Sequence, residues 1–261
     1  MRVHQLYSPG DSLLHLLTPA TKLVGALGFL SLIFLFPWPW TAGIVLAVLS
    51  LLAAVSSLWR KFAGIVFRAA LPYVLMLLVM QSLFFPGGAT PLLRLAWFTV
   101  KLEGVMYATV TALRILAMVA VFVLVQMVTH PAAMMADLEQ RGLSSKVTYV
   151  VVSTLNILPF LMGRAGAILD AQRSRGLETE GSILRRGRAL LSLIGPLVVG
   201  TINDVQDRAV ALELRGFSRT GTRTFLTDTS GPPCDRALRL VMWGLAAVGL
   251  LGRVVAWVWP G

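Results

Sequence analysis

Two stretches of the sequence repeat one pattern that ends in arginine and glycine. Residues 171–177 read AQRSRGL and residues 211–217 read ALELRGF, so both fit A-x-x-x-R-G-[LF], 40 residues apart. Alanine and arginine four positions apart share one face of a helix, and a following glycine is typical of a helix end. The pattern predicts two helix ends, each with a guanidinium beside a small residue that lets a partner surface approach. The candidate site consists of Ala171, Arg175, Gly176, Ala211, Arg215 and Gly216.

An arginine before a helix-ending glycine also has a purely structural explanation. A cation in the last turn complements the helix dipole, and glycine adopts the left-handed conformation that ends the helix. A third tripeptide, Arg141-Gly142-Leu143, has Asp137 where the pattern requires alanine, and the preceding helix is expected to be short. Recurrence of the full pattern on two long helices favours a function for Arg175 and Arg215, with ordinary helix caps as the alternative.

The composition indicates that these helix ends belong to a membrane protein. Of 261 residues, 56% are hydrophobic and 13% are charged, about half the charged fraction of an average soluble domain. The mean hydropathy is +0.77. Residues 137–236 hold 13 basic and 10 acidic side chains, whereas the other 161 positions hold 10 basic and two acidic ones. The fold class predicted is an all-α membrane protein with one charged, water-facing segment.

Apolar runs of bilayer length predict about five transmembrane helices. The 37-residue run from Leu23 to Trp59 is too long for one span and is divided at Pro37-Trp38-Pro39-Trp40, because proline cannot continue a helix. The remaining spans are expected within Ala69–Leu93, Glu103–Thr129 and Ala237–Trp259. The domains are then an N-terminal transmembrane domain of four spans (1–130), cytoplasmic amphipathic helices (131–236) and a C-terminal transmembrane helix (237–261).

Charge bias predicts the orientation of these spans. Arg60, Lys61 and Arg68 follow the second span, and the positive-inside rule places that loop in the cytoplasm. The N-terminus is then cytoplasmic and the C-terminus external, in a multi-pass protein of the cell membrane. Arg94 and Lys101 fall outside in this arrangement, which counts against it.

Two apolar runs inside the charged segment are predicted to stay out of the membrane. Residues 147–163 contain Asn156 and Pro159, and residues 189–203 are only 15 long and contain Gly195-Pro196. Both lead into charged helical sequence without a turn signal. Each is therefore expected to be the apolar first half of a long amphipathic helix, and two extra spans stay the alternative.

Other classes of function lack the residues that they require. Outside the charged segment the acidic residues are Asp11 and Glu103, and no G-x-x-x-x-G-K-[ST] occurs, so neither an intramembrane enzyme nor ATP binding by a P-loop is expected. The net charge of +11 fits anionic lipid rather than nucleic acid, since no nucleic-acid module accompanies it. Neither a metal site nor a cofactor is expected, because the candidate ligands Cys234, His4, His15 and His130 are not clustered.

These features together resemble the transmembrane T component of energy-coupling-factor (ECF) transporters, the CbiQ/EcfT family. The resemblance covers nearly the whole chain and rests on Leu16–Lys22, on Ala112–Leu116 and on the two helix ends. The family signature is a pair of Ala-Arg-Gly tripeptides, whereas this chain has Ser174 and Leu214 in place of the alanines. Arg114 lies at membrane depth, where a function and helix packing are equally open explanations.

The resemblance implies a non-catalytic scaffold of an ATP-driven importer. Such a subunit joins two cytoplasmic ABC-type ATPases, which bind the ATP, to a substrate-capturing membrane protein, the S component, for vitamin or transition-metal uptake. Arg175 and Arg215 would each enter a groove on one ATPase, and a planar guanidinium suits such a joint because it makes bidentate bonds. The alternative is the permease of a conventional ABC importer, which would offer one short coupling loop. An intramembrane enzyme is the less favoured alternative.

Overall fold

The structure, a computed structural model, describes residues 7–8, 10, 12–36, 38–85, 91–95, 98–176, 183–219, 221, 224–225, 231 and 234–258. The chain divides into two compact units, which are described separately. The membrane unit comprises residues 4–141 and 229–261, and the α7–α8 unit comprises residues 142–228. The predicted all-α membrane fold is confirmed, with a short β-hairpin in addition.

The first two helices of the bundle confirm the predicted break at the Pro-Trp repeat. A single turn, α1 (Leu13–Leu16), precedes α2 (Pro19–Leu35), and α3 (Pro39–Val55) follows after the break. Both α2 and α3 have proline at their first position, where the missing N–H is not needed by the helix.

A helical hairpin forms the middle of the membrane unit. Helix α4 (Trp59–Phe84) is followed by β1 (Pro91–Leu95), β2 (Phe98–Lys101) and α5 (Leu102–Val128), and the two strands pair antiparallel. The strands were not predicted, because most of their residues lie between the expected spans Ala69–Leu93 and Glu103–Thr129, in a short connection for which no regular structure was expected. Gly104 permits the close contact of α4 and α5, since a Cβ there would lie 2.5 Å from the backbone oxygen of Gln81.

One prediction about α4 is wrong. Arg60, Lys61 and Arg68 were placed in a loop, but all three lie within the first three turns of α4. The turn between α3 and α4 needs only residues 56–58, and Ser57 adopts a positive φ of 57° there.

Small residues on α5 let the helices of the membrane unit pack closely. Ala108, Ala112, Ala117 and Ala120 are at most 5% exposed, and small side chains favour close helix contacts in membrane proteins. Around them lie larger buried side chains from four helices, among them Ile33, Leu49, Phe62, Val121 and Met127.

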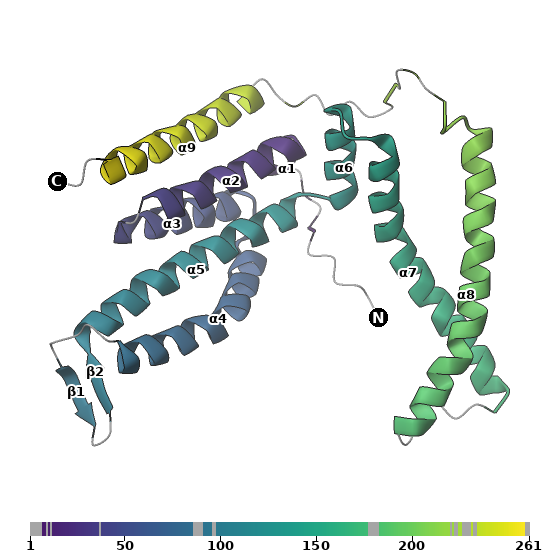
Figure 1. The fold of residues 1–261 in the computed structure, drawn as a ribbon, viewed down its shortest axis with the longest axis horizontal. Coiled ribbons are helices and arrows are strands. Elements are labelled where there is room, and N and C mark those ends of the chain that lie inside the picture. Colours follow the sequence, from purple (N-terminus) through teal and green to yellow (C-terminus); the bar gives the residue numbers. More distant parts are fainter. Residues whose placement is uncertain are drawn as a thin grey trace. The chain divides into compact units, whose positions relative to one another are not determined.

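The last helix, α9 (Cys234–Val258), runs parallel to α2, as Figure 1 shows for the yellow and purple helices. Asp235 contacts Thr18 at the start of α2, and Gly249 lies against Leu35 at its end. The predicted C-terminal helix is therefore present, and its end lies on the same side as the end of α2.

The segment predicted as cytoplasmic contains α6 (Pro131–Gln140), α7 (Ser145–Ser174) and α8 (Ile183–Leu214). The long helices α7 and α8 confirm that each apolar run continues into charged sequence, with Pro159 and Pro196 inside them. Helix α6 belongs instead to the membrane unit because it packs against α2, so the structural boundary differs from those predicted at 130/131 and 236/237.

Three of the described helices are long and apolar enough to cross a membrane, namely α4, α5 and α7, whereas α2 and α3 are apolar helices of 17 residues. Residues 147–163, a run of 17 residues that contains Asn156 and Pro159, are of borderline length for a span. The helix around them is 30 residues long. The length argument against a span at α7 therefore no longer holds.

Candidate functional site

The backbone ends α7 as the arginine-glycine pattern predicts. The helix ends at Ser174, Arg175 follows with φ −88° and ψ 8°, and Gly176 has φ +89°. The Gly176 N–H donates to the Arg173 carbonyl at 2.9 Å. A positive φ strains residues that carry a Cβ, so glycine is the residue that this position favours.

The end of α8 repeats this arrangement. The helix ends at Leu214, and Gly216 has φ +72° and donates its N–H to the Glu213 carbonyl at 2.9 Å. The Phe217 N–H reaches back to the Leu212 carbonyl at 2.9 Å. Both arginines of the pattern are therefore held at the last turn of a helix that a left-handed glycine ends.

The two guanidinium groups have no partner among the residues that the structure describes. Within the part of the chain that the structure describes, no hydrogen bond or ion pair is made by the side chain of Arg175 or Arg215, and both are exposed. Ala171 and Ala211, one turn earlier, are exposed too. Each helix end thus presents an available cation beside a small residue.

The third tripeptide has the same backbone but a different side-chain environment. Gly142 has φ +107° after α6, so the left-handed glycine does not distinguish the three arginines. Arg141, however, bonds through Nε to Asp137 Oδ1 at 2.9 Å, and the Asp137 residue is 1% exposed. The Arg141 side chain is bound inside the membrane unit. The Arg175 and Arg215 side chains are exposed and have no such partner among the described residues.

Helices α7 and α8 cross, as Figure 1 shows, and an ion pair joins them. The Arg164 guanidinium on α7 bonds to the Asp204 carboxylate on α8. Gly200, one turn before Asp204, leaves room for this guanidinium, because a Cβ there would lie 2.7 Å from Nη2. Phe160 completes the crossing, with the guanidinium carbons of Arg164 and Arg208 at 5.9 Å and 6.0 Å from its ring centroid.

The two arginines of the repeated pattern lie equally far along their helices from this crossing. Arg175 follows Arg164 by 11 residues, and Arg215 follows Asp204 by 11 residues. At 1.5 Å per residue each arm is about 16 Å long. The helices run antiparallel, because the Tyr149 ring near the start of α7 lies 5.3 Å from the Phe217 ring after the end of α8.

Much apolar surface on α7 and α8 is not covered by their own unit. Large exposed hydrophobic side chains on the two helices include Val147, Val150, Leu155, Leu158, Phe160, Met162, Leu191, Ile194, Val198, Val199, Ile202 and Val205. Apolar surface of this extent is typical of an interface with lipid or with another protein.

The remaining candidate residues form no metal centre among the residues described. His15 and His130 both contact the Tyr7 ring, at centroid distances of 6.3 Å and 5.2 Å, and no group of three metal-ligating side chains occurs in that part of the chain. His4 and the side chain of Cys234 lie outside the described set. Arg114 is half-buried on α5.

A cavity of about 450 Å³ in the membrane unit is almost entirely apolar. It lies among α2, α3, α5 and α9, and Thr21 and Lys22 are the polar side chains among the described residues that line it. The Lys22 ammonium donates to the Val128 carbonyl at 2.9 Å. The cavity therefore lacks the convergent polar groups with which proteins orient a small polar ligand.

Sequence reasoning missed several residues that organise these units. The ion pair of Arg164 with Asp204 could have been suspected from the sequence, because the two residues are 40 positions apart, as are the two copies of the arginine-glycine pattern. The buried carboxylates Asp137 and Asp235 had no such signal, since their partners Ala20 and Thr18 are distant in sequence.

Comparison with known proteins connects this geometry to one family. Residues 10–225 match the family model described as cobalt transport protein (CbiQ). Curated relatives match over most of their length. The energy-coupling factor transporter transmembrane protein EcfT of Brevibacillus brevis is 30% identical over 84% of this chain and 86% of its own. That of Exiguobacterium sibiricum is 29% identical over 93% and 94%, and that of Acidaminococcus fermentans is 26% identical over 92% of each.

Proposed function

The chain belongs to the CbiQ/EcfT family, the transmembrane T components of energy-coupling-factor transporters, and on that premise we propose that it is the scaffold and coupling subunit of such an importer. It joins two cytoplasmic ABC-type ATPases to a membrane S component that captures the substrate. The observation that carries this proposal is the pair of exposed arginines at the ends of the crossed helices α7 and α8, whose side chains have no partner among the residues described.

Each arginine suits one ATPase of a pair. The two helix ends have the same backbone geometry, and antiparallel packing places them at opposite ends of the crossed pair. A guanidinium is permanently charged and forms bidentate bonds with carboxylates, so it holds its partner while the subunits move. Arg175 and Arg215, with the neighbouring Ala171, Gly176, Ala211 and Gly216, form the ATPase-coupling site.

The chain itself acts without catalysis or cofactor in this proposal, and ATP is bound by the ATPases. The absence of a P-loop sequence supports this division of labour. The cargo is a vitamin or a transition metal, whose identity is set by the S component. The family description names cobalt, which suits the metal alternative.

The N-terminus and the α7–α8 unit lie in the cytoplasm and the C-terminus lies outside in the orientation that we propose. Five spans, α2, α3, α4, α5 and α9, give opposite sides for the two chain ends. The parallel packing of α2 and α9 supports an odd number of spans, because both helices must then begin on the same side.

The permease of a conventional ABC importer is the alternative function. The chain has two long helices that each end in an arginine and a left-handed glycine, which favours the T component. A conventional permease would offer one short coupling loop instead. Co-purification of the chain with its partners separates the two. Recovery of two ATPases and a separate small membrane protein supports the T component, whereas transport with ATPases alone would establish the permease.

A further inference from the structure

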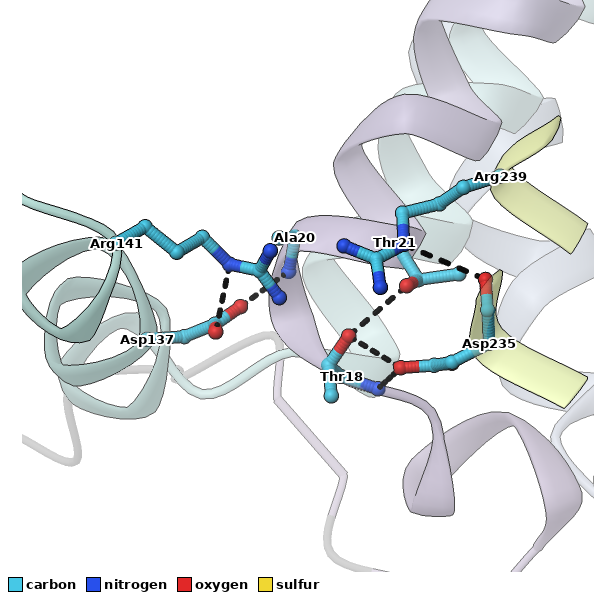
Figure 2. A network of polar contacts seen from close by, with 7 residues as sticks. All are labelled: Thr18, Ala20, Thr21, Asp137, Arg141, Asp235 and Arg239. Atoms are coloured by element: carbon cyan, nitrogen blue, oxygen red, sulfur yellow. Dashed lines mark hydrogen bonds and ion pairs between the residues drawn. The ribbon is translucent and has the colours of Figure 1, made fainter. Parts of the chain in front are cut away.

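The first turn of α2 is capped by other helices rather than by its own residues. Thr18 is the N-cap residue but makes no side-chain capping bond, and Pro19 has no N–H. The N–H of Ala20 is instead satisfied by Asp137 Oδ2 from α6 at 2.7 Å (Figure 2). A carboxylate at this position also complements the positive end of the helix dipole.

A second carboxylate holds the same turn from α9. Asp235 Oδ2 accepts a hydrogen bond from the Thr18 hydroxyl at 2.5 Å and one from the Thr18 N–H at 3.3 Å. The Thr18 and Thr21 hydroxyls lie 2.9 Å apart, so the network continues into the helix (Figure 2). Gly231 packs directly on this cluster, because a Cβ there would overlap the Asp235 carboxylate.

Both carboxylates are buried, and each aspartate residue is bonded by an arginine four positions later, at the side chain of Asp137 and at the backbone of Asp235. Asp137 is 1% exposed and Asp235 is 2% exposed. Arg141 binds Asp137, and Arg239 donates through Nε to the Asp235 carbonyl at 3.3 Å. A buried carboxylate that loses its hydrogen bonds is strongly destabilised. These contacts therefore hold their elements in fixed positions on α2.

The two carboxylates occupy special places along the chain. Asp137 lies one helical turn before Arg141, where the membrane unit passes into the α7–α8 unit at Gly142. Asp235 lies shortly after the chain re-enters the membrane unit at residue 229. Helix α6, which leads into the α7–α8 unit, and the first turn of α9 are thus each held to the first turn of α2 through one buried carboxylate.

We propose that Asp137 and Asp235 are positioning residues for energy coupling, which transmit displacement of the α7–α8 unit to α2 through this shared turn. This inference rests on the proposed function, since it requires that ATPases move α7 and α8. Helix α2 is suited to receive the displacement, because it packs along α9 and against the core through Ile33. The carboxylates touch neither ATPase nor cargo and act through the helix that they hold.

The test uses the full complex, with both ATPases and the S component, in proteoliposomes. Asp137→Ala and Asp235→Ala are compared with Asp137→Asn and Asp235→Asn, whose amide oxygen can still accept the hydrogen bond. The measured quantities are recovery of the ATPases, the rate of ATP hydrolysis and the amount of substrate transported per ATP. Asp207→Asn is the control, an exposed carboxylate on α8 that takes no part in the network.

We expect the alanine variants to retain their ATPases and hydrolyse ATP, while transport per ATP falls by on the order of tenfold. The asparagine variants should recover a large part of the transport, and the control should match the wild type. Unchanged transport per ATP in assembled alanine variants would overturn the proposal. So would a loss that asparagine fails to recover, or one that follows complex recovery in simple proportion, because a merely structural role predicts these results.

Two further measurements keep the outcome decisive. Thr18→Val removes the hydroxyl that donates to Asp235 but keeps both aspartates. This variant must lower transport per ATP even if the alanine variants fail to fold. Failure of the proposed function would be seen separately, because the wild-type chain would then either recover no ATPases or transport with ATPases alone, without an S component.

Discussion

Arg164 on α7 and Asp204 on α8 form the ion pair at which the two long helices cross, and each precedes by 11 residues the exposed arginine that follows its own helix. The crossing therefore determines how far apart Arg175 and Arg215 lie. The side chains of Arg164 and Asp204 are 33% and 28% exposed. Solvent screening therefore limits the contribution of this ion pair to the free energy of unfolding to about 1 kcal/mol.

Enlarging Gly200 should disturb this crossing. In Gly200→Ala the new Cβ would meet the Arg164 guanidinium at 2.7 Å, so we expect the ion pair to shift and transport per ATP to fall about two- to fivefold, which corresponds to at most about 1 kcal/mol. Gly163→Ala is the matched control, because nothing lies within 4 Å of its Cβ position. A drop of equal size in both variants would contradict the role of the crossing.

Charge reversal at the helix ends should uncouple the ATPases. For Arg175→Glu and Arg215→Glu we expect ATPase binding to weaken by roughly 30-fold to several thousand-fold, since losing a desolvated interface arginine costs about 2–5 kcal/mol. The fold should lose about 1 kcal/mol or less from the dipole interaction. Binding of the ATPases to detergent-purified chain, alongside thermal unfolding, measures both effects.

Arg219→Glu is the control for these reversals, because Arg219 is exposed and lies outside the repeated pattern. Arg141 is unsuitable despite its Arg-Gly-Leu sequence. Glutamate there would face the buried Asp137 carboxylate and destabilise the membrane unit. If the reversals at residues 175, 215 and 219 all leave ATPase binding equally unchanged, Arg175 and Arg215 are ordinary helix caps.

Residue 261 and the start of α4 should be labelled from opposite sides of the membrane. With Cys234 replaced by serine, a cysteine at residue 261 is expected to react with an impermeant thiol reagent added outside. One at residue 60 in α4 should react only after permeabilisation, because the basic start of α4 faces the cytoplasm. A cytoplasmic residue 261 would mean that the number of spans is even, with α7 as the first helix to reconsider.

The isolated chain should bind neither a vitamin nor a divalent metal tightly. The cavity of about 450 Å³ is lined by apolar side chains except for Thr21 and Lys22, which cannot supply the ligand set of a metal or orient a polar molecule. Calorimetry with cobalt, nickel and water-soluble vitamins should give no saturable heat. Specific binding in the micromolar range or below would contradict the separate S component.

Local features of the sequence were sufficient to predict most elements. Hydropathy over bilayer-length windows identified α2 to α5 and α9, because the energy of burying apolar side chains in lipid depends on each segment by itself. The ends of α7 and α8 were predictable for a similar reason, since a left-handed glycine ends a helix through bonds within one turn. The paired strands at residues 91–95 and 98–101 escaped prediction because they are short and lie mostly between two predicted spans.

Tertiary structure alone decided which of the similar residues are equivalent. Arg141, Arg175 and Arg215 all precede a glycine with a positive φ, yet only the first is bound by a buried carboxylate among the residues described. The attachment of Asp137 and Asp235 to one turn of α2 joins positions more than 100 residues apart. Such pairings leave no periodicity in the sequence, because they depend on how completed helices pack and on which buried polar groups then lie within hydrogen-bond distance.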